Sequence, residues 1–431
     1  GQPGGYASLD ASGNVPAEQL GNVEGMEEHG NEWHNPSFLT MTDLEGHANG
    51  VGVHKKPARI VVGSYFDGWE EKDCDFLCYR AWDHTTINNA IAALPDGGGE
   101  VILLDGIYHI STASIDGGIV IEKDNVVLRG NGNNTVLVRT TSAKSIIKLK
   151  SVTGCRIENL RFDKDAAGHY DDECSVLVEN SNDNAIIDIV CNNQYGAGII
   201  LESSHRNRIS NNICMANGDG IRLSDSGSNI IIGNICQQNT GSGINLIEGC
   251  NNNIIKGNSC LNNTSDGIQV FTGIANNVVG NVCNGNGGNG IKVYSANSAV
   301  SGNVCNNNGK DGIRVGSPNV AISGNTCFEN SNIGISGRYG TPHQAAIVGN
   351  ICKDNATGIR LDSSINSIII GNICVRGEGL ATDYTEDHYT ISVANIGNSV
   401  VAYNNCTGKD VSVSFGGNNL IEKNKYNPPF S

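Results

Sequence analysis

Two carboxylates at matching positions of neighbouring sequence repeats are the first candidates for catalysis. Asp225 and Glu248 each stand two residues past the last apolar position of an Ile-x-Leu pattern. If the repeats stack at the spacing of parallel strands, their carboxyl groups lie about 5 Å apart, as in a retaining glycosidase. Like charges at that distance raise the pKa of one carboxyl group, which a general acid requires.

A second row of carboxylates offers a different geometry. Asp219, Asp266 and Asp311 each precede a Gly-Ile pair and are separated by two repeats. Neighbours in this row would lie roughly 10 Å apart, which suits the acid and base of an inverting glycosidase. The alternative is that these aspartates accept hydrogen bonds from the local backbone.

A row of polar side chains is the candidate substrate-binding surface. One residue in each Gly-Ile-x-Val segment is expected to point outward, and this position reads Arg222, Asn245, Gln269, Lys292 and Arg314. Cations and amides bind acidic or hydroxyl-rich sugars. Phe271 and Tyr294 follow on consecutive repeats, where they could stack on sugar rings. A solvated face with incidental aromatic residues is the alternative.

The repeat that positions these residues has the form Ile-x-Gly-Asn-x-Cys-x-x-Asn-x-x-x-Gly-Ile-x-Val and recurs every 22 to 25 residues. Apolar alternation indicates short strands, and the Gly and Asn residues between them indicate turns. Three strands and three turns per repeat predict an all-β fold, a single-stranded right-handed parallel β-helix. Two Asn ladders are expected at its corners, because Asn tolerates the left-handed backbone of a bend.

Cysteines occupy one position of the repeat. The chain has 15 cysteines and no Cys-x-x-Cys pair. They are predicted to form an inward column of small apolar side chains, with a geometry unsuited to disulfides. We expect them to be reduced, which suggests synthesis in a reducing compartment.

Three segments are predicted along the chain. Residues 1–60 are rich in Gly, Asn and His and are interpreted as an N-terminal tether. Residues 61–99 form a capping segment, in which Ile87, Ala90, Ile91 and Leu94 have the spacing of an amphipathic helix. Residues 100–431 form the β-helix of about 13 or 14 coils.

Composition excludes several partners. The formal net charge is −16 and the sequence pI is near 5, which argues against nucleic acid. No run of 18 apolar residues occurs, so no membrane span is expected. His169 and His388, in long insertions at 163–174 and 376–389, and the four N-terminal histidines lack a convincing ligand spacing. No metal and no cofactor are therefore predicted.

The repeat resembles the pectate-lyase-like right-handed β-helix superfamily over roughly residues 75–425. The segments GGYASLDASGNVPAEQL and HGNEWHNPSFLT resemble connecting segments of phage and prophage tail proteins. Together they imply a tailspike-like appendage, homotrimeric, attached through its N-terminus to a tail or baseplate, and acting on a bacterial surface polysaccharide. The implied location is the virion tail, extracellular after assembly in the host cytoplasm. The paired aspartates, Gly-His-Gly and Arg-Ile-Lys of polygalacturonases and the Asp-Pro-His motif of alginate epimerases are missing.

An apolar stripe supports association. The residue before each repeat cysteine should point outward, yet it is mostly β-branched and apolar: Ile213, Ile235, Ser259, Val282, Val304, Thr326, Ile351 and Ile373. Such a stripe suggests a trimer interface, although β-branched residues favour strands anyway. Two other hypotheses stay open: a free polysaccharide lyase, hydrolase or epimerase, and a non-catalytic structural spacer.

Overall fold

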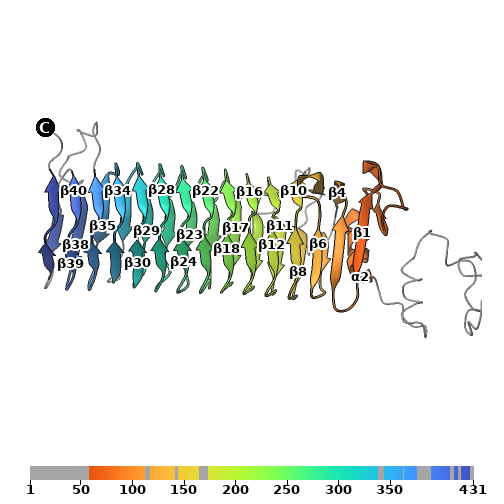
Figure 1. Ribbon diagram of the computed structural model, residues 1–431, viewed down its shortest axis with the longest axis horizontal. Coiled ribbons are helices and arrows are strands. Elements are labelled where there is room, and N and C mark those ends of the chain that lie inside the picture. Colours follow the sequence, from red (N-terminus) through yellow and green to blue (C-terminus); the bar gives the residue numbers. More distant parts are fainter. Residues whose placement is uncertain are drawn as a thin grey trace, which may run out of the picture.

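The computed structural model describes residues 58–111, 117–140, 144–164, 173–337, 344–362, 364–375, 390–407, 412–415 and 419–427. Most of the predicted tether and of the two long insertions, with His169 and His388, lies outside these residues. In the described ranges the chain forms an elongated stack of coils with helix α2 at one end (Figure 1). No helix in these ranges is long and apolar enough to cross a membrane.

Three parallel sheets, here named A, B and C, run the length of the stack and confirm the predicted right-handed parallel β-helix. Each coil contributes one strand to each sheet in the order A, B, C. Over the described residues the sheets contain 16, 14 and 13 strands, close to the predicted number of coils.

Sheet A consists, in spatial order, of β2 (Phe76–Cys78), β1 (Arg59–Ser64), β3 (Gly99–Leu103), β6 (Val126–Arg129), β9 (Arg156–Glu158), β12 (Ala185–Ile187), β15 (Arg208–Ser210), β18 (Ile230–Ile232), β21 (Ile254–Lys256), β24 (Asn277–Val279), β27 (Ala299–Ser301), β30 (Val320–Ser323), β33 (Ala345–Val348), β36 (Ile368–Ile370), β39 (Val400–Ala402) and β42 (Leu420–Glu422). Sheet B consists of β4 (Gly106–Ile110), β7 (Thr135–Arg139), β10 (Arg161–Lys164), β13 (Val190–Asn192), β16 (Ile213–Met215), β19 (Ile235–Gln237), β22 (Ser259–Leu261), β25 (Val282–Asn284), β28 (Val304–Asn306), β31 (Thr326–Phe328), β34 (Ile351–Lys353), β37 (Ile373–Val375), β40 (Asn405–Thr407) and β43 (Lys425–Asn427). Sheet C consists of β5 (Ile119–Ile121), β8 (Ser145–Lys150), β11 (Cys174–Glu179), β14 (Ala197–Glu202), β17 (Asp219–Ser224), β20 (Ile244–Leu246), β23 (Ile268–Val270), β26 (Ile291–Val293), β29 (Ile313–Val315), β32 (Ile333–Gly337), β35 (Thr357–Asp362), β38 (Ile391–Ile396) and β41 (Ser412–Phe415).

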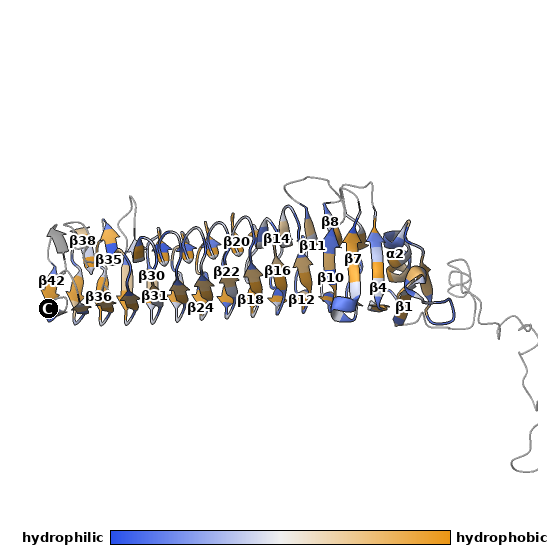
Figure 2. Ribbon diagram, turned by 90° about the horizontal axis from the view of Figure 1, so that it is seen from above, coloured by the Kyte–Doolittle hydropathy of each residue, from blue (hydrophilic) through white to orange (hydrophobic). Residues whose placement is uncertain are grey.

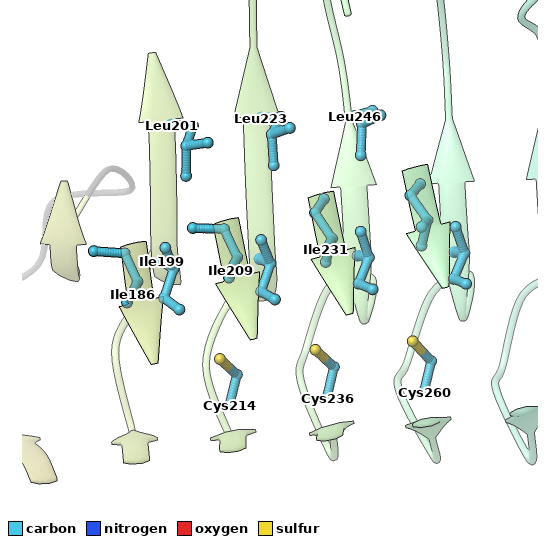
Figure 3. Close-up of a cluster of buried hydrophobic side chains, with 14 of the residues drawn as sticks. Ile186, Ile199, Leu201, Ile209, Cys214, Leu223, Ile231, Cys236, Leu246 and Cys260 are labelled. Carbon is cyan, nitrogen blue, oxygen red and sulfur yellow. The ribbon is translucent and has the colours of Figure 1, made fainter. Parts of the chain in front are cut away.

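The interior is built from columns of like residues. Ile221 pairs with Ile244, and Ile244 with Ile268, so that equivalent side chains stack directly. Cys214, Cys236 and Cys260 form a parallel column from sheet B (Figure 3). In the hydropathy view, apolar strand segments follow one another along the whole stack (Figure 2). The predicted core positions are therefore confirmed.

All 15 cysteines are free thiols, and all but Cys74 are buried. Burial raises the pKa of Cys191 and Cys283 well above the usual thiol value, because a thiolate would lose its hydration inside the coil. These two thiols therefore stay neutral, and the buried column fills the coil with small side chains, as the sequence predicts.

The two predicted Asn ladders are present. In the first, Asn234 donates from Nδ2 to Asn258 Oδ1 over 2.9 Å, and Asn258 donates to Asn281 over 3.0 Å. In the second, Asn239 donates to Asn263 over 2.9 Å. Each buried amide thus satisfies its polar atoms on the neighbouring coils.

One detail of the ladders differs from the sequence prediction. The left-handed residue is the one before the ladder Asn, for example Gly233 with φ 68°. The ladder Asn is needed for its amide rather than for its backbone freedom. A third ladder, which includes Asn207, Asn229 and Asn253, follows sheet C and was not predicted.

The capping segment closes the N-terminal end of the sheets. The helix α2 (Asp83–Ala93) buries Ile87, Ala90 and Ile91, as predicted. Its Asn88 caps the edge strand β5, because Nδ2 donates to Gly118 O and Oδ1 accepts from Val120 N.

Carboxylates cap the edge strand β4 in the same way. Asp67, in the 3-10 helix η3 (Tyr65–Asp67), accepts from Ile107 N, and Asp83 accepts from His109 N. Backbone N–H groups of the edge strands β4 and β5 are thus already hydrogen-bonded and cannot pair with a strand of another chain. A second short 3-10 helix, η4 (Gly132–Asn134), precedes β7. Strand β1 crosses the predicted boundary between the tether and the capping segment, β2 lies within the capping segment, and both belong to sheet A.

Candidate functional site

The predicted binding row lies in register on the outer side of sheet C. Adjacent strands pair Arg222 with Asn245, Asn245 with Gln269, Gln269 with Lys292, and Lys292 with Arg314. These five side chains are half-buried because they lie against one another along the sheet. The sequence pattern therefore placed all five on one face.

The side chains of this row form a relay across four coils. Asn245 Nδ2 donates to Asp219 Oδ2 over 2.9 Å, and Gln269 Nε2 donates to Asn245 Oδ1 over 3.1 Å. Lys292 Nζ then donates to Gln269 Oε1 over 3.4 Å. This directional chain holds the amides at fixed positions on the face.

The two aromatic residues stand at the corner where sheet C ends. Phe271 is 48% exposed, and its ring centroid lies 6.2 Å from that of Tyr294. Lys292 Nζ lies 5.7 Å from the centroid of Phe271 and 5.2 Å from that of Tyr294, within the range of cation–π attraction. We call Phe271, Lys292 and Tyr294 the aromatic corner.

Gly316 supports the aromatic corner and was not singled out from the sequence. A Cβ atom at Gly316 would lie 2.5 Å from ring carbons of Tyr294, so the ring lies against the backbone of the next coil. The signal in the sequence was the column Ile247, Phe271, Tyr294, Gly316, in which a glycine follows two aromatic residues.

The first carboxylate pair, Asp225 and Glu248, is exposed at the same corner. Asp225 has φ 49°, and its backbone N–H donates to Glu248 O over 2.6 Å. In a parallel pairing this bond aligns Asp225 with Gly249, and a Cβ atom on Gly249 would lie 2.2 Å from Asp225 Oδ1. The two carboxylates are thus offset by one residue along the chain rather than directly stacked.

The second carboxylate row is engaged with the backbone of the following coil. Asp219 Oδ1 accepts from Ser242 N over 2.7 Å. Asp266 Oδ1 accepts from the backbone N of Asn289 over 2.6 Å and from its Nδ2 over 2.7 Å. Asp266 is 4% exposed. Both aspartates therefore make the local backbone contacts that were the alternative to a catalytic role.

No cluster of three His, Cys, Asp or Glu side chains with the arrangement of a metal site occurs in the described ranges.

Towards the N-terminal end, the outer face of sheet C is covered by buried groups. Lys148 and Glu179 form an ion pair of 2.9 Å, and the side chain of Lys148 is 4% exposed. Cys174, Leu177, Ala197 and Ile200 form a small apolar cluster separate from the main core.

Known proteins share this architecture. A family model described as periplasmic copper-binding protein (NosD) matches residues 118–297. No curated protein sequence matches the chain. Among solved structures, the A-module of the mannuronan C-5 epimerase AlgE6 from Azotobacter vinelandii superimposes with a TM-score of 0.61 at 19% identity, over 80% of this chain and 96% of the module.

The AlgE4 A-module from the same organism gives a TM-score of 0.51 at 18% identity, over 86% of this chain and all of the module. The Dettilon tailspike protein gives 0.43 at 14% identity, over 77% of this chain and 60% of the tailspike. The chain is a right-handed parallel β-helix. At these identities the likeness extends to the fold alone.

Proposed function

We propose that the protein binds a polysaccharide on the outer face of sheet C, between β17 and β29, as a phage-tail-type appendage. The observation that carries the proposal is the aromatic corner beside the amide relay. Exposed aromatic rings next to fixed hydrogen-bonding groups offer a sugar both a stacking surface and partners for its hydroxyl groups.

The similar structures support a role with polysaccharide. The two modules with TM-scores of 0.61 and 0.51 are named mannuronan C-5 epimerases, and mannuronan is a polysaccharide. The long register-aligned face of sheet C offers a polymer several consecutive contacts in the same way.

Replacing Phe271 by alanine tests the binding proposal. Truncation removes one stacking surface and is expected to lower the affinity for a bound polysaccharide by about tenfold. Isothermal titration against soluble capsule and cell-wall polysaccharides measures the effect. Tyr403→Ala, which removes an exposed aromatic ring between β39 and β40, is the matched control. An unchanged affinity in Phe271→Ala would place the binding site elsewhere.

Cleavage at the corner is the finer proposal. Asp225 and Glu248, the two exposed carboxylates at this corner, are the proposed acid and nucleophile or base. Asp225→Asn and Glu248→Gln are expected to abolish depolymerisation and to retain binding, because only the transition state needs the charges. Full activity in both variants, measured by release of reducing ends, would exclude this pair.

The outer stripe of sheet B supports the proposal of a homotrimer. The residues preceding the column cysteines pair in register, and Ile235, Val282, Ile351 and Ile373 are between 36% and 39% exposed. Ile235→Lys with Val304→Lys would place charges in such an interface and should yield monomers by light scattering. If the unmodified protein is already a monomer in solution, the stripe is not a trimer interface.

Attachment through residues 1–60 to a tail or baseplate, and an extracellular position on the virion, complete the proposal. Removing these residues should abolish incorporation into particles and leave polysaccharide binding intact. A free enzyme or a spacer rod would show no dependence on particle assembly.

A further inference from the structure

Three cations on the outer face of sheet C, Lys148, Lys292 and Arg360, are paired with carboxylates of the protein itself. Lys292 Nζ lies 3.9 Å from Asp266 Oδ2, in addition to its bond to Gln269. Farther along the same row, Lys148 pairs with Glu179 over 2.9 Å, and Arg360 pairs with Asp362 over 3.2 Å. Such internal pairs reduce the attraction that each cation exerts on an incoming anion.

Carboxylates also outnumber cations around the aromatic corner. On sheet C and its turns between residues 219 and 315, the carboxylates are Asp219, Asp225, Glu248, Asp266 and Asp311, and the cations are Arg222, Lys292, Lys310 and Arg314. Asp225 and Glu248 are the exposed members of the first set. The backbone hydrogen bond from Phe271 N to Leu246 O aligns Phe271 with Ile247 on the neighbouring coil. Glu248 is the residue that directly follows Ile247.

A polyanion laid over the rings would therefore approach exposed carboxylates. Like charges brought together at an interface oppose binding, and the loss is larger when water is displaced. At the centre of the row, next to these carboxylates, the uncharged groups available for contact are the amides of Asn245 and Gln269 and the rings of Phe271 and Tyr294. Amides donate to and accept from hydroxyl groups, and rings stack on the C–H faces of sugars.

We infer that the polysaccharide bound on this face is an uncharged one, recognised by the amide relay and the aromatic corner, and not a polyuronate. The inference rests on the proposed function and specifies its ligand. It departs from the mannuronan that is named for the similar epimerase modules.

Binding to a panel of polymers of known charge tests the inference. The probes are dextran and laminarin, soluble oligomers of N-acetylglucosamine, alginate, polygalacturonate, and chitosan. At least one uncharged probe is expected to bind more tightly than every charged one. Its dissociation constant should change by less than about twofold between about 50 and about 500 mM NaCl, because screening acts on charged partners.

Tighter binding of alginate or polygalacturonate, weakened by salt, would overturn the inference and leave the proposed function standing. Tighter binding of chitosan would also overturn the inference, because it would make the exposed carboxylates the recognition groups. If no probe and no bacterial surface polysaccharide binds, the proposed function itself fails. The outcomes for the two proposals are thus distinguishable.

A variant provides a second measurement. Asp266→Asn removes the carboxylate beside Lys292, and an asparagine at this position still accepts from Asn289 N. We expect it to increase affinity for alginate at low salt by about threefold or more, since Lys292 loses its internal counter-charge. Asp188→Asn removes an exposed carboxylate distant from the corner and is the matched control. An equal affinity for alginate in both variants would show that Asp266 does not mask Lys292.

Discussion

On the outer face of sheet C, the outward side chains are buried in the N-terminal part and half-buried in the central part. In β8, β11 and β14 the outward row reads Lys148, Leu177 and Ile200, and all three are buried. In β20, β23 and β26 the same row reads Asn245, Gln269 and Lys292, and all three are half-buried. The closed section (β8, β11 and β14) has six-residue strands and an outward row that is mostly apolar, whereas the open section (β20, β23 and β26) has three-residue strands and a polar row.

The difference shows that a β-helix can support a second small core outside its coils. The closed section combines buried ion pairs with apolar side chains, whereas the open section joins amides into a relay beside the rings of the aromatic corner. Changes in the closed section should therefore affect the free energy of unfolding, and changes in the open section should affect ligand binding.

The largest effect is expected at Glu173. Its carboxylate lies 3.5 Å from Arg139, and each side chain is 2% exposed. Glu173→Gln leaves the buried guanidinium without its counter-charge and should lower the free energy of unfolding by about 3 to 5 kcal/mol. Urea unfolding followed by circular dichroism measures this. A loss below about 1 kcal/mol would mean that the closed section is hydrated, contrary to the structure.

A matched pair on one row gives the next effect. Leu177→Ala empties part of the small apolar cluster and should cost about 2 to 4 kcal/mol of stability. Gln269→Ala, at the equivalent outward position of the open section, removes one partly exposed relay bond and should cost about 1 kcal/mol or less. Similar losses in the two variants would remove the distinction between the sections.

The pH dependence of stability provides a third test. Burial raises the pKa of Cys174, in the closed section, to about 12. A thiol in the unfolded chain has a pKa near 8.5, so the folded state retains a proton that the unfolded state releases. This contribution is fully present below that value and is lost as the pH rises towards 12.

The expected slope for this one thiol is about 1.4 kcal/mol per pH unit above pH 9. Cys174→Ala should flatten the dependence by that amount relative to the unmodified protein, with the thiols of the inner column present in both. Equal slopes in the two proteins would mean that Cys174 ionises in the folded state.

The repeat explains which parts of the molecule could be predicted. Period and alternation determine the inner columns of Ile and Cys, two of the Asn ladders, and the register of the polar row. The amphipathic spacing of Ile87, Ala90 and Ile91 likewise predicted α2. These features depend on backbone geometry that recurs in every coil.

The side-chain contacts between coils could not be predicted in this way. The pairing of Lys292 with Asp266 depends on how long side chains orient across coils. The offset of Asp225 against Gly249 depends on a left-handed residue at an irregular corner. Ile200 pairs with Arg222 of the polar row on one side, but its side chain packs with Leu177, the apolar residue on its other side.

The smallest expected change in stability, and the most specific to the open section, concerns Gly316. Its backbone does not require glycine, since it is absent from the positive-φ positions, but the ring of Tyr294 occupies the space of a Cβ atom. Gly316→Ala should displace the ring and reduce polysaccharide affinity severalfold, while stability changes by about 1 kcal/mol or less. Gly97→Ala, where nothing lies within 4 Å of the added Cβ, is the matched control. If Tyr294→Ala weakens binding but Gly316→Ala does not, the Tyr294 ring binds the ligand without needing its contact with Gly316. If neither variant weakens binding, the aromatic corner is not the binding site.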